Sequence, residues 1–150
     1  SWCLFLHADT KLGPGWATVT KRFMERPENQ FRAGYFHFVL DSNNWAARWL
    51  EKIVDLRCRI FSLPYGDQGL LISSEFYKRL GGFPQIPLME DVALIRAIPR
   101  HRLEKLPCIA ITSAKRYRRD GYVIRSVKNV FLLILYFLGI SPALLAKLYD

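Results

Sequence analysis

The stretch FRAGYFHFVL, residues 31–40, followed by DSNNWAARWLEKIVDLRCRIFSLP, residues 41–64, decides the fold class. Its first part is rich in aromatic and β-branched residues, which favour a β-strand. In its second part, the Asp-Ser-Asn run at 41–43 can cap a helix, and apolar residues then recur at helical spacing up to Pro64. The recurring residues are Trp45, Trp49, Ile53, Leu56 and Ile60, with Ala46, Leu50, Val54 and Phe61 beside them. The stretch therefore predicts a strand and then a helix with a broad apolar face.

The same alternation continues on both sides of this stretch. Residues 2–6 form a continuous apolar run, which is typical of a buried strand, and His7-Ala8-Asp9 follows at its carboxyl end. Further strands are expected at 69–72 and 106–111, and helices at 16–25, from about Ser74 to Gly81, and at 91–98. Strands that alternate with helices predict an α/β fold, and no linker or repeat divides residues 1–150 into separate domains.

Composition narrows the classes of partner. A chain of 150 residues with 51% hydrophobic content can bury the core of one compact domain or of part of a larger one. The net charge of +9 indicates an anionic partner, which could be a nucleic acid, a phospholipid surface or a phosphorylated small molecule. Nucleic acid is not expected, because no clustered basic and aromatic motif is present. Three widely spaced cysteines favour a reducing, cytoplasmic setting.

The C-terminal segment, residues 115–150, differs in character from the rest. Residues 115–128 carry six cations and one acid, and the apolar run VFLLILYFLGI follows at 130–140. This run is shorter than the roughly 20 residues that a membrane-spanning helix needs. Two interpretations stay open: a helix buried in a core or subunit interface, or a helix lying in the headgroup layer with its cations on anionic lipid.

Two polar groups of residues are candidates for ligand binding. His7 and Asp9 end the first predicted strand, and ligands gather at the carboxyl ends of strands in open α/β sheets. A carboxylate at such a place can hold a hard divalent cation, although Asp9 could equally belong to a turn. In the second group, Gly66 lets the backbone approach a ligand while Asp67 and Gln68 bond to hydroxyl groups. A plain β-turn explains the same residues.

The third candidate is the acidic doublet Glu90-Asp91 in GGFPQIPLMEDVALIRAI, residues 81–98. Acidic residues are scarce in this chain, with 13 against 22 Lys and Arg. At the start of a helix, Asp91 could satisfy free backbone N–H groups, which stabilises a helix by about 1 kcal/mol. It could also act as a general base, and the two roles are compatible.

These segments together resemble a known family. They are LFLHADT at 4–10, YGDQGLLISSEFYKRLGGFPQIPLMEDVAL at 65–94, TSAKRY at 112–117 and the ending LYFLGISPALLAKLY at 135–149. In this order they are similar to the family 2 glycosyltransferases of the GT-A fold, and within them to a bacterial branch of selenodomain-associated transferases. The resemblance covers essentially the whole chain, and GGFP followed by PLMEDV is its most specific part.

The resemblance implies a partial GT-A fold: a mixed sheet flanked by helices, with the C-terminal basic and apolar helical segment after it. It also implies a divalent metal, Mg²⁺ or Mn²⁺, at the family's Asp-x-Asp motif. Asp9 matches the second acid of that motif, and His7 stands where the first acid would be. The family's Glu-Asp motif matches Glu90 and Asp91, so that both belong to the implied catalytic site, with Asp91 as the base and Glu90 as a neighbour that positions the acceptor or the loop.

The remaining matches concern substrates. Gly66, Asp67 and Gln68 match a family segment that lines the sugar and acceptor pocket. Lys115 and Arg116, with Tyr117 after them, fall where related enzymes close over the diphosphate. The implied reaction is an inverting transfer of a sugar from a nucleotide-sugar donor to an acceptor hydroxyl.

Family members carry a strand-helix-strand unit, which holds the nucleotide, ahead of the strand that ends in HADT. Because the chain opens directly on that strand, we expect a truncated catalytic domain that binds nucleotide-sugars weakly or not at all by itself. We expect a cytoplasmic protein that can sit on the inner face of the membrane. The alternative is a non-catalytic module that binds an anionic membrane surface through residues 115–150.

Overall fold

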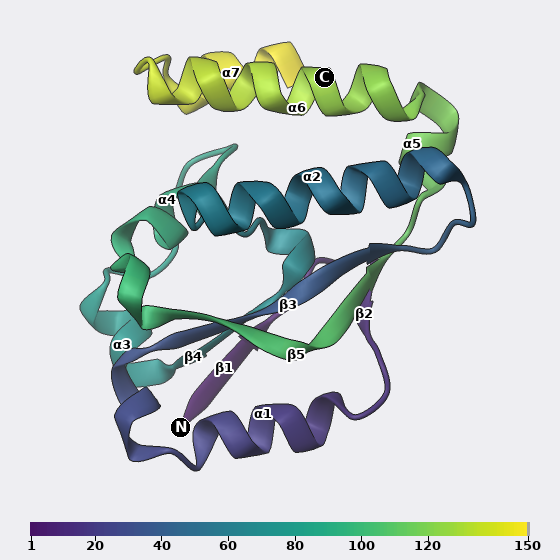
Figure 1. Ribbon diagram of the computed structural model, residues 1–150. Coiled ribbons are helices and arrows are strands. Elements are labelled where there is room, and N and C mark those ends of the chain that lie inside the picture. Colours follow the sequence, from purple (N-terminus) through teal and green to yellow (C-terminus); the bar gives the residue numbers. More distant parts are fainter. Residues whose placement is uncertain (150) are drawn as a thin grey trace.

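The structure, a computed structural model, describes residues 1–149, and within them five strands form one mixed sheet (Figure 1). The strand order is β1-β4-β3-β5-β2. The strands are β1 (Trp2–Phe5), β2 (Thr10–Leu12), β3 (Ala33–Leu40), β4 (Leu70–Ser73) and β5 (Leu103–Thr112). The α-helices are α1 (Trp16–Met24), α2 (Trp45–Phe61), α3 (Ser74–Arg79), α4 (Glu90–Ala97), α5 (Lys115–Asp120), α6 (Tyr122–Phe137) and α7 (Pro142–Tyr149). The predicted α/β class is confirmed.

Strand β3 lies at the centre of the sheet. It pairs with β4 in the antiparallel direction and with β5 in the parallel direction, and most of its side chains are buried. The sequence predicted this strand from its aromatic and β-branched content. It starts at Ala33 rather than at Phe31, because the 3-10 turn Pro27–Phe31 precedes it.

Strand β1 is half-buried, whereas the sequence predicted a buried strand. Its four residues pair only with β4, so β1 is an edge strand of the five-stranded sheet. The three-residue strand β2 was not predicted. It pairs with β5 at the opposite edge, from Thr10 beside Thr112 to Leu12 beside Ala110.

Helices cover both faces of the sheet. Helix α1 lies on one side, and helices α2, α5, α6 and α7 lie on the other (Figure 1). Phe23 of α1 packs with Phe36 of β3 and Leu106 of β5 on the first side. On the second side, Phe38 packs with Leu50 of α2. A third cluster joins β4 to α3 and α4 through Ile72, Phe76, Val92 and Ile95.

The N-cap of helix α2 is Asn44, and not one of the predicted residues 41–43. The Asn44 side chain accepts a hydrogen bond from the Ala46 N–H at 2.9 Å. Asp41 is engaged elsewhere, because its Oδ1 accepts the Ala114 N–H at 2.6 Å, next to the start of α5.

The predicted apolar face of α2 is present, but only part of it packs on the core. The residues that α2 buries are Ala47, Leu50, Glu51, Val54 and Cys58. The stripe that contains Trp49 and Ile53 points to solvent, and Trp49 is 62% exposed. Apolar residues thus occupy two sides of this helix, and helical spacing does not tell which side faces the sheet.

Helix α6 also carries exposed apolar residues, and Leu132 is the one residue that it buries fully. Within residues 1–149, no helix is long and apolar enough to cross a membrane.

Substitutions on the two sides of α2 test this orientation. We expect Leu50→Ala to lower the free energy of unfolding by about 2–5 kcal/mol, because it opens a cavity beneath the helix. We expect Ile53→Ala to change it by less than about 0.5 kcal/mol, because Ile53 already contacts water. Denaturant unfolding of both variants measures the difference, and a larger loss for Ile53→Ala would contradict this orientation.

Candidate functional site

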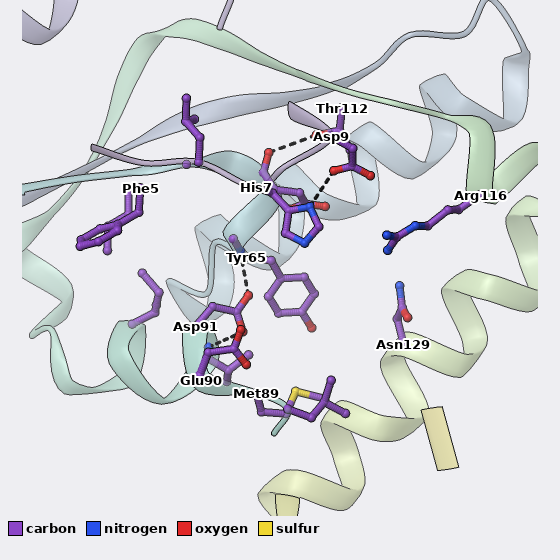
Figure 2. Close-up of a pocket in the computed structure, with 18 of the residues that line it drawn as sticks. Phe5, His7, Asp9, Tyr65, Met89, Glu90, Asp91, Thr112, Arg116 and Asn129 are labelled. Atoms are coloured by element: carbon purple, nitrogen blue, oxygen red, sulfur yellow. Dashed lines mark hydrogen bonds and ion pairs between the residues drawn. The ribbon is translucent and has the colours of Figure 1, made fainter. Parts of the chain in front are cut away.

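A cavity of about 620 Å³ opens beside the end of β1. Its lining comes from the turn after β1, the turn before β4, the start of α4, and helices α5 and α6 (Figure 2). Its polar lining residues are His7, Asp9, Tyr65, Asp67, Glu90, Asp91, Thr112, Ser113, Arg116, Tyr117, Arg125, Asn129 and Tyr149. Phe5, Leu70, Phe83, Met89, Val92, Ile95 and Leu132 are among the apolar ones. The three polar groups singled out in the sequence thus converge on one cavity.

The turn after β1 presents His7 and Asp9. It is tight, because the Thr10 N–H donates to the His7 carbonyl at 3.0 Å before β2 begins. The Ser113 N–H donates to the Asp9 carbonyl at 3.1 Å and fixes the turn against the end of β5. His7 Nδ1 lies 2.6 Å from Asp9 Oδ1, with both side chains partly exposed to the cavity. The imidazole therefore orients the carboxylate while leaving its other oxygen available.

The second group, Gly66 to Gln68, forms a 3-10 turn directly before β4. Gly66 and Asp67 line the cavity, but Gln68 does not. Gln68 is 2% exposed, and its side-chain Oε1 accepts from Arg57, Cys58 Sγ and the Tyr65 N–H. Its Nε2 donates to the Phe36 carbonyl of β3 at 3.2 Å. Gln68 therefore anchors the turn instead of reaching the cavity where the sequence placed it.

Asp67 lies in the middle of this turn and is in an unfavourable place for a charge. Its Oδ1 is buried and has no hydrogen-bond partner. Burial raises the pKa of Asp67 from 3.8 to about 6, and the nearby Asp91 and Asp9 charges add to the rise. Arg57 and His7 oppose it. At neutral pH the cavity wall thus holds a poorly solvated carboxylate close to two others.

The third group begins helix α4. The N-cap is Met89, in the left-handed conformation with φ 68°, and no side chain caps the helix. Asp91 is the second helical residue, so it is not the N-cap. Its Oδ1 accepts the Val92 N–H at 2.7 Å and its Oδ2 accepts the Gly66 N–H at 2.8 Å. Asp91 therefore joins α4 to the turn before β4, and Glu90 lies exposed beside it on the same wall (Figure 2).

Gly66 is needed where Asp91 approaches the turn. A Cβ at residue 66 would lie 3.3 Å from Asp91 Oδ2, which is tighter than most side-chain contacts. A larger residue would therefore push the carboxylate away from the Gly66 N–H.

Helices α5 and α6 form the opposite wall. The Arg116 side chain extends toward the His7–Asp9 pair, with Asn129 next to it (Figure 2). Lys115 was predicted as its companion, but it is exposed and does not line the cavity. The cavity therefore has carboxylates on one wall and a guanidinium on the other.

Some lining residues were missed at the level of sequence. Arg125 of α6 donates to the Tyr149 hydroxyl at 2.9 Å and pairs with Asp120 at 2.9 Å, so it joins α5, α6 and α7 at the cavity wall. Asn129 is the last polar residue before the apolar run at 130–140, and that position was a signal that could have pointed to it. No signal pointed to Arg125 among so many cations.

No protein-family model, curated protein or solved structure matches the chain.

Among residues 1–149, no group of three or more His, Cys, Asp or Glu side chains is arranged to hold a metal ion. One observation favours a bound cation here: the buried Oδ1 of Asp67 has no hydrogen-bond partner and lies close to the carboxylates of Asp9 and Asp91. One or two carboxylates are what Mg²⁺ requires when phosphate oxygens and water complete its coordination.

The Asp67 carboxylate should make stability depend on pH. Because its pKa is higher in the folded state than in the unfolded state, stability is lost as pH rises from about 4 to about 6, by up to about 3 kcal/mol. Asp67→Asn removes this loss, so we expect the variant to be more stable than the wild type at pH 8 and equally stable at pH 4. Denaturant unfolding at both pH values measures this. A variant less stable than the wild type at pH 8 would contradict it.

Proposed function

We propose that the chain forms the catalytic part of a metal-dependent, inverting glycosyltransferase, and that its mixed sheet is part of a GT-A fold. The observation that carries the proposal is that residues from distant parts of the chain converge on one cavity, which Asp9, Asp67, Asp91 and Arg116 all line. The partners would be a nucleotide-sugar donor and an acceptor that bears a hydroxyl group.

Asp91 is the proposed general base. The acceptor oxygen forms a bond to the anomeric carbon while its proton passes to the Asp91 carboxylate. The bond from that carbon to the donor diphosphate breaks, and the diphosphate leaves with the electron pair. A hydroxyl group needs a carboxylate within hydrogen-bond reach for this step. Each Asp91 oxygen already accepts one backbone N–H, and an ionised carboxylate has about four acceptor positions, so capacity remains.

The opposite side of the cavity would hold the diphosphate. The Arg116 guanidinium can donate two parallel hydrogen bonds to phosphate oxygens. Asp9 would hold the divalent cation, Mg²⁺ or Mn²⁺, which supplies positive charge to the leaving diphosphate. His7, which lies 2.6 Å from Asp9, would orient that carboxylate. We propose a cytoplasmic location as part of the same hypothesis, and the three cysteines are free thiols.

Substitution of the acidic doublet tests the base. In the full-length protein, we expect Asp91→Asn to lower the rate of sugar transfer by about 10²–10⁴-fold, because the proton acceptor is lost. Glu90→Gln is the matched control, since it makes the same chemical change at the next residue, and we expect a far smaller effect. Binding of a nucleoside diphosphate, measured by calorimetry, should be the same in both variants.

Unchanged transfer by the Asp91→Asn variant would contradict the assignment of the base. A full-length protein without any transfer activity that still binds anionic vesicles would favour the alternative, a non-catalytic membrane-surface module.

Arg116 and Lys115 form a second matched pair. We expect Arg116→Gln to weaken binding of a nucleoside diphosphate with Mg²⁺ by about 10- to 100-fold, as is typical when a hydrogen bond to a charged group is lost. Lys115→Gln removes the same charge outside the cavity and should have little effect. Calorimetric titration of both variants measures this. Equal weakening by the two substitutions would show that charge alone matters, and would contradict a specific role for Arg116.

A further inference from the structure

Helix α2 exposes a stripe of large apolar side chains. Its members are between 48% and 74% exposed, and they are Trp45, Trp49, Ile53, Leu56 and Ile60. Because an α-helix turns by about 100° per residue, these five residues fall within an arc of about 80°. The stripe lies on the side of the helix away from Leu50 and Val54, which pack on the sheet. It is therefore additional to the core-facing side.

Cations form a row along one edge of this stripe. Arg48, Lys52 and Arg59 are exposed, and at about 100° per residue they fall within an arc of about 40° beside it. Arg48 pairs with Glu51 at 3.0 Å, and Arg59 pairs with Asp55 at 2.8 Å. The apolar stripe itself contains no acidic residue. An exposed apolar stripe with a basic edge is the pattern of helices that lie at a membrane surface.

Helix α6 repeats this pattern. Its exposed apolar residues, with the one that follows it, are Val123, Ile124, Val127, Val130, Phe131, Ile134, Phe137 and Leu138. The opposite side of α6 carries the buried Leu132 and the cavity residue Asn129. The short helix α5 lies directly before α6 and exposes Lys115, Arg118 and Arg119. Arg119 pairs with Asp120, and Lys115 has no ion pair within residues 1–149.

Helices α2, α5 and α6 lie on the same side of the sheet, opposite α1 (Figure 1). The five apolar residues of the α2 stripe and the exposed apolar residues of α6, from Val123 to Leu138, are together called the α2–α6 surface. Extended apolar patches are rare on soluble monomers, and a patch with a polar rim marks an interaction site. The exposed apolar side chains of α2 and α6 are therefore candidates for contact with a partner.

We propose that the α2–α6 surface docks on an anionic phospholipid membrane. Charge favours an anionic partner: a row of cations lies beside the α2 stripe, α5 exposes further cations directly before α6, and the chain carries a net charge of +9. A second copy of the chain is a poorer partner, because it would bring the same basic rows together. Anionic headgroups pair with those rows while the Trp and aliphatic side chains enter the layer between headgroups and acyl chains. This docking is independent of the proposed sugar transfer.

Vesicle binding by the 150-residue chain tests the proposal. We expect co-sedimentation with vesicles of phosphatidylglycerol and phosphatidylcholine, weaker binding at high salt, and little binding to phosphatidylcholine alone. Trp49→Ser with Ile53→Ser should weaken binding more than about tenfold, since both side chains would enter the membrane. Both residues are exposed, so the variant should keep the circular dichroism spectrum and thermal unfolding of the wild type.

A charge variant on α2 has a matched control on α1. Each cation near an anionic surface strengthens binding by about fivefold. Lys52→Gln with Arg59→Gln should therefore weaken vesicle binding by between about fivefold and about 25-fold. The lower end of this range applies because Asp55 partly neutralises Arg59. The control Lys21→Gln with Arg22→Gln removes the same charge from α1, on the other side of the sheet, and should have a much smaller effect. Trp16→Ser on α1 is the matching control for Trp49→Ser.

Three results would overturn the proposal. The first is equal binding to vesicles with and without phosphatidylglycerol. The second is equal weakening by the α1 controls and the α2 variants. The third is a dimer, seen by sedimentation equilibrium, that Trp49→Ser with Ile53→Ser dissociates while vesicle binding stays unchanged, because the surface would then bind a second copy of the chain.

Discussion

The site depends on the hydrogen bonds of one buried group, the side-chain carboxamide of Gln68. Two of its four hydrogen bonds come from Arg57 and Cys58 of helix α2, and a third comes from the Tyr65 N–H. The fourth goes to the Phe36 carbonyl of the central strand β3. This network fixes the turn at 66–68 against the sheet. The fixed turn then places Asp67 at the cavity and points the Gly66 N–H at Asp91. The anchor therefore positions Asp67 directly, and it positions the backbone N–H that Asp91 accepts.

The fold could be predicted from the sequence wherever local composition decided the outcome. Strand β3 and helices α1 and α2 follow directly from their aromatic, β-branched and periodic residues. The orientation of α2 could not be predicted, because apolar residues occupy two of its sides and only the packing against β3 selects one of them. Strand β2 is three residues long, and it depends on pairing with β5, about 100 residues later.

The site was predictable in part, for the same reason. Asp9 was singled out at the end of a predicted strand, Asp67 in a glycine-flanked turn, and Glu90 and Asp91 as a rare acidic doublet, and all of them line the cavity. Gln68 could not be told from a ligand-binding residue, since an amide beside two glycines suits either role. Arg116 and Lys115 are neighbours with the same charge, and only the turn of α5 brings one of them to the cavity.

The cavity and the α2–α6 surface share helix α6, whose one side carries Asn129 and whose other side carries the exposed apolar stripe. A crystal structure of the full-length protein with a nucleoside diphosphate and Mn²⁺ would test the arrangement of the cavity most directly. We expect the diphosphate to lie between Asp9 and Arg116, with open space for an acceptor hydroxyl next to Asp91. A diphosphate bound away from this cavity, or one that covers the Asp91 carboxylate, would contradict the proposed function.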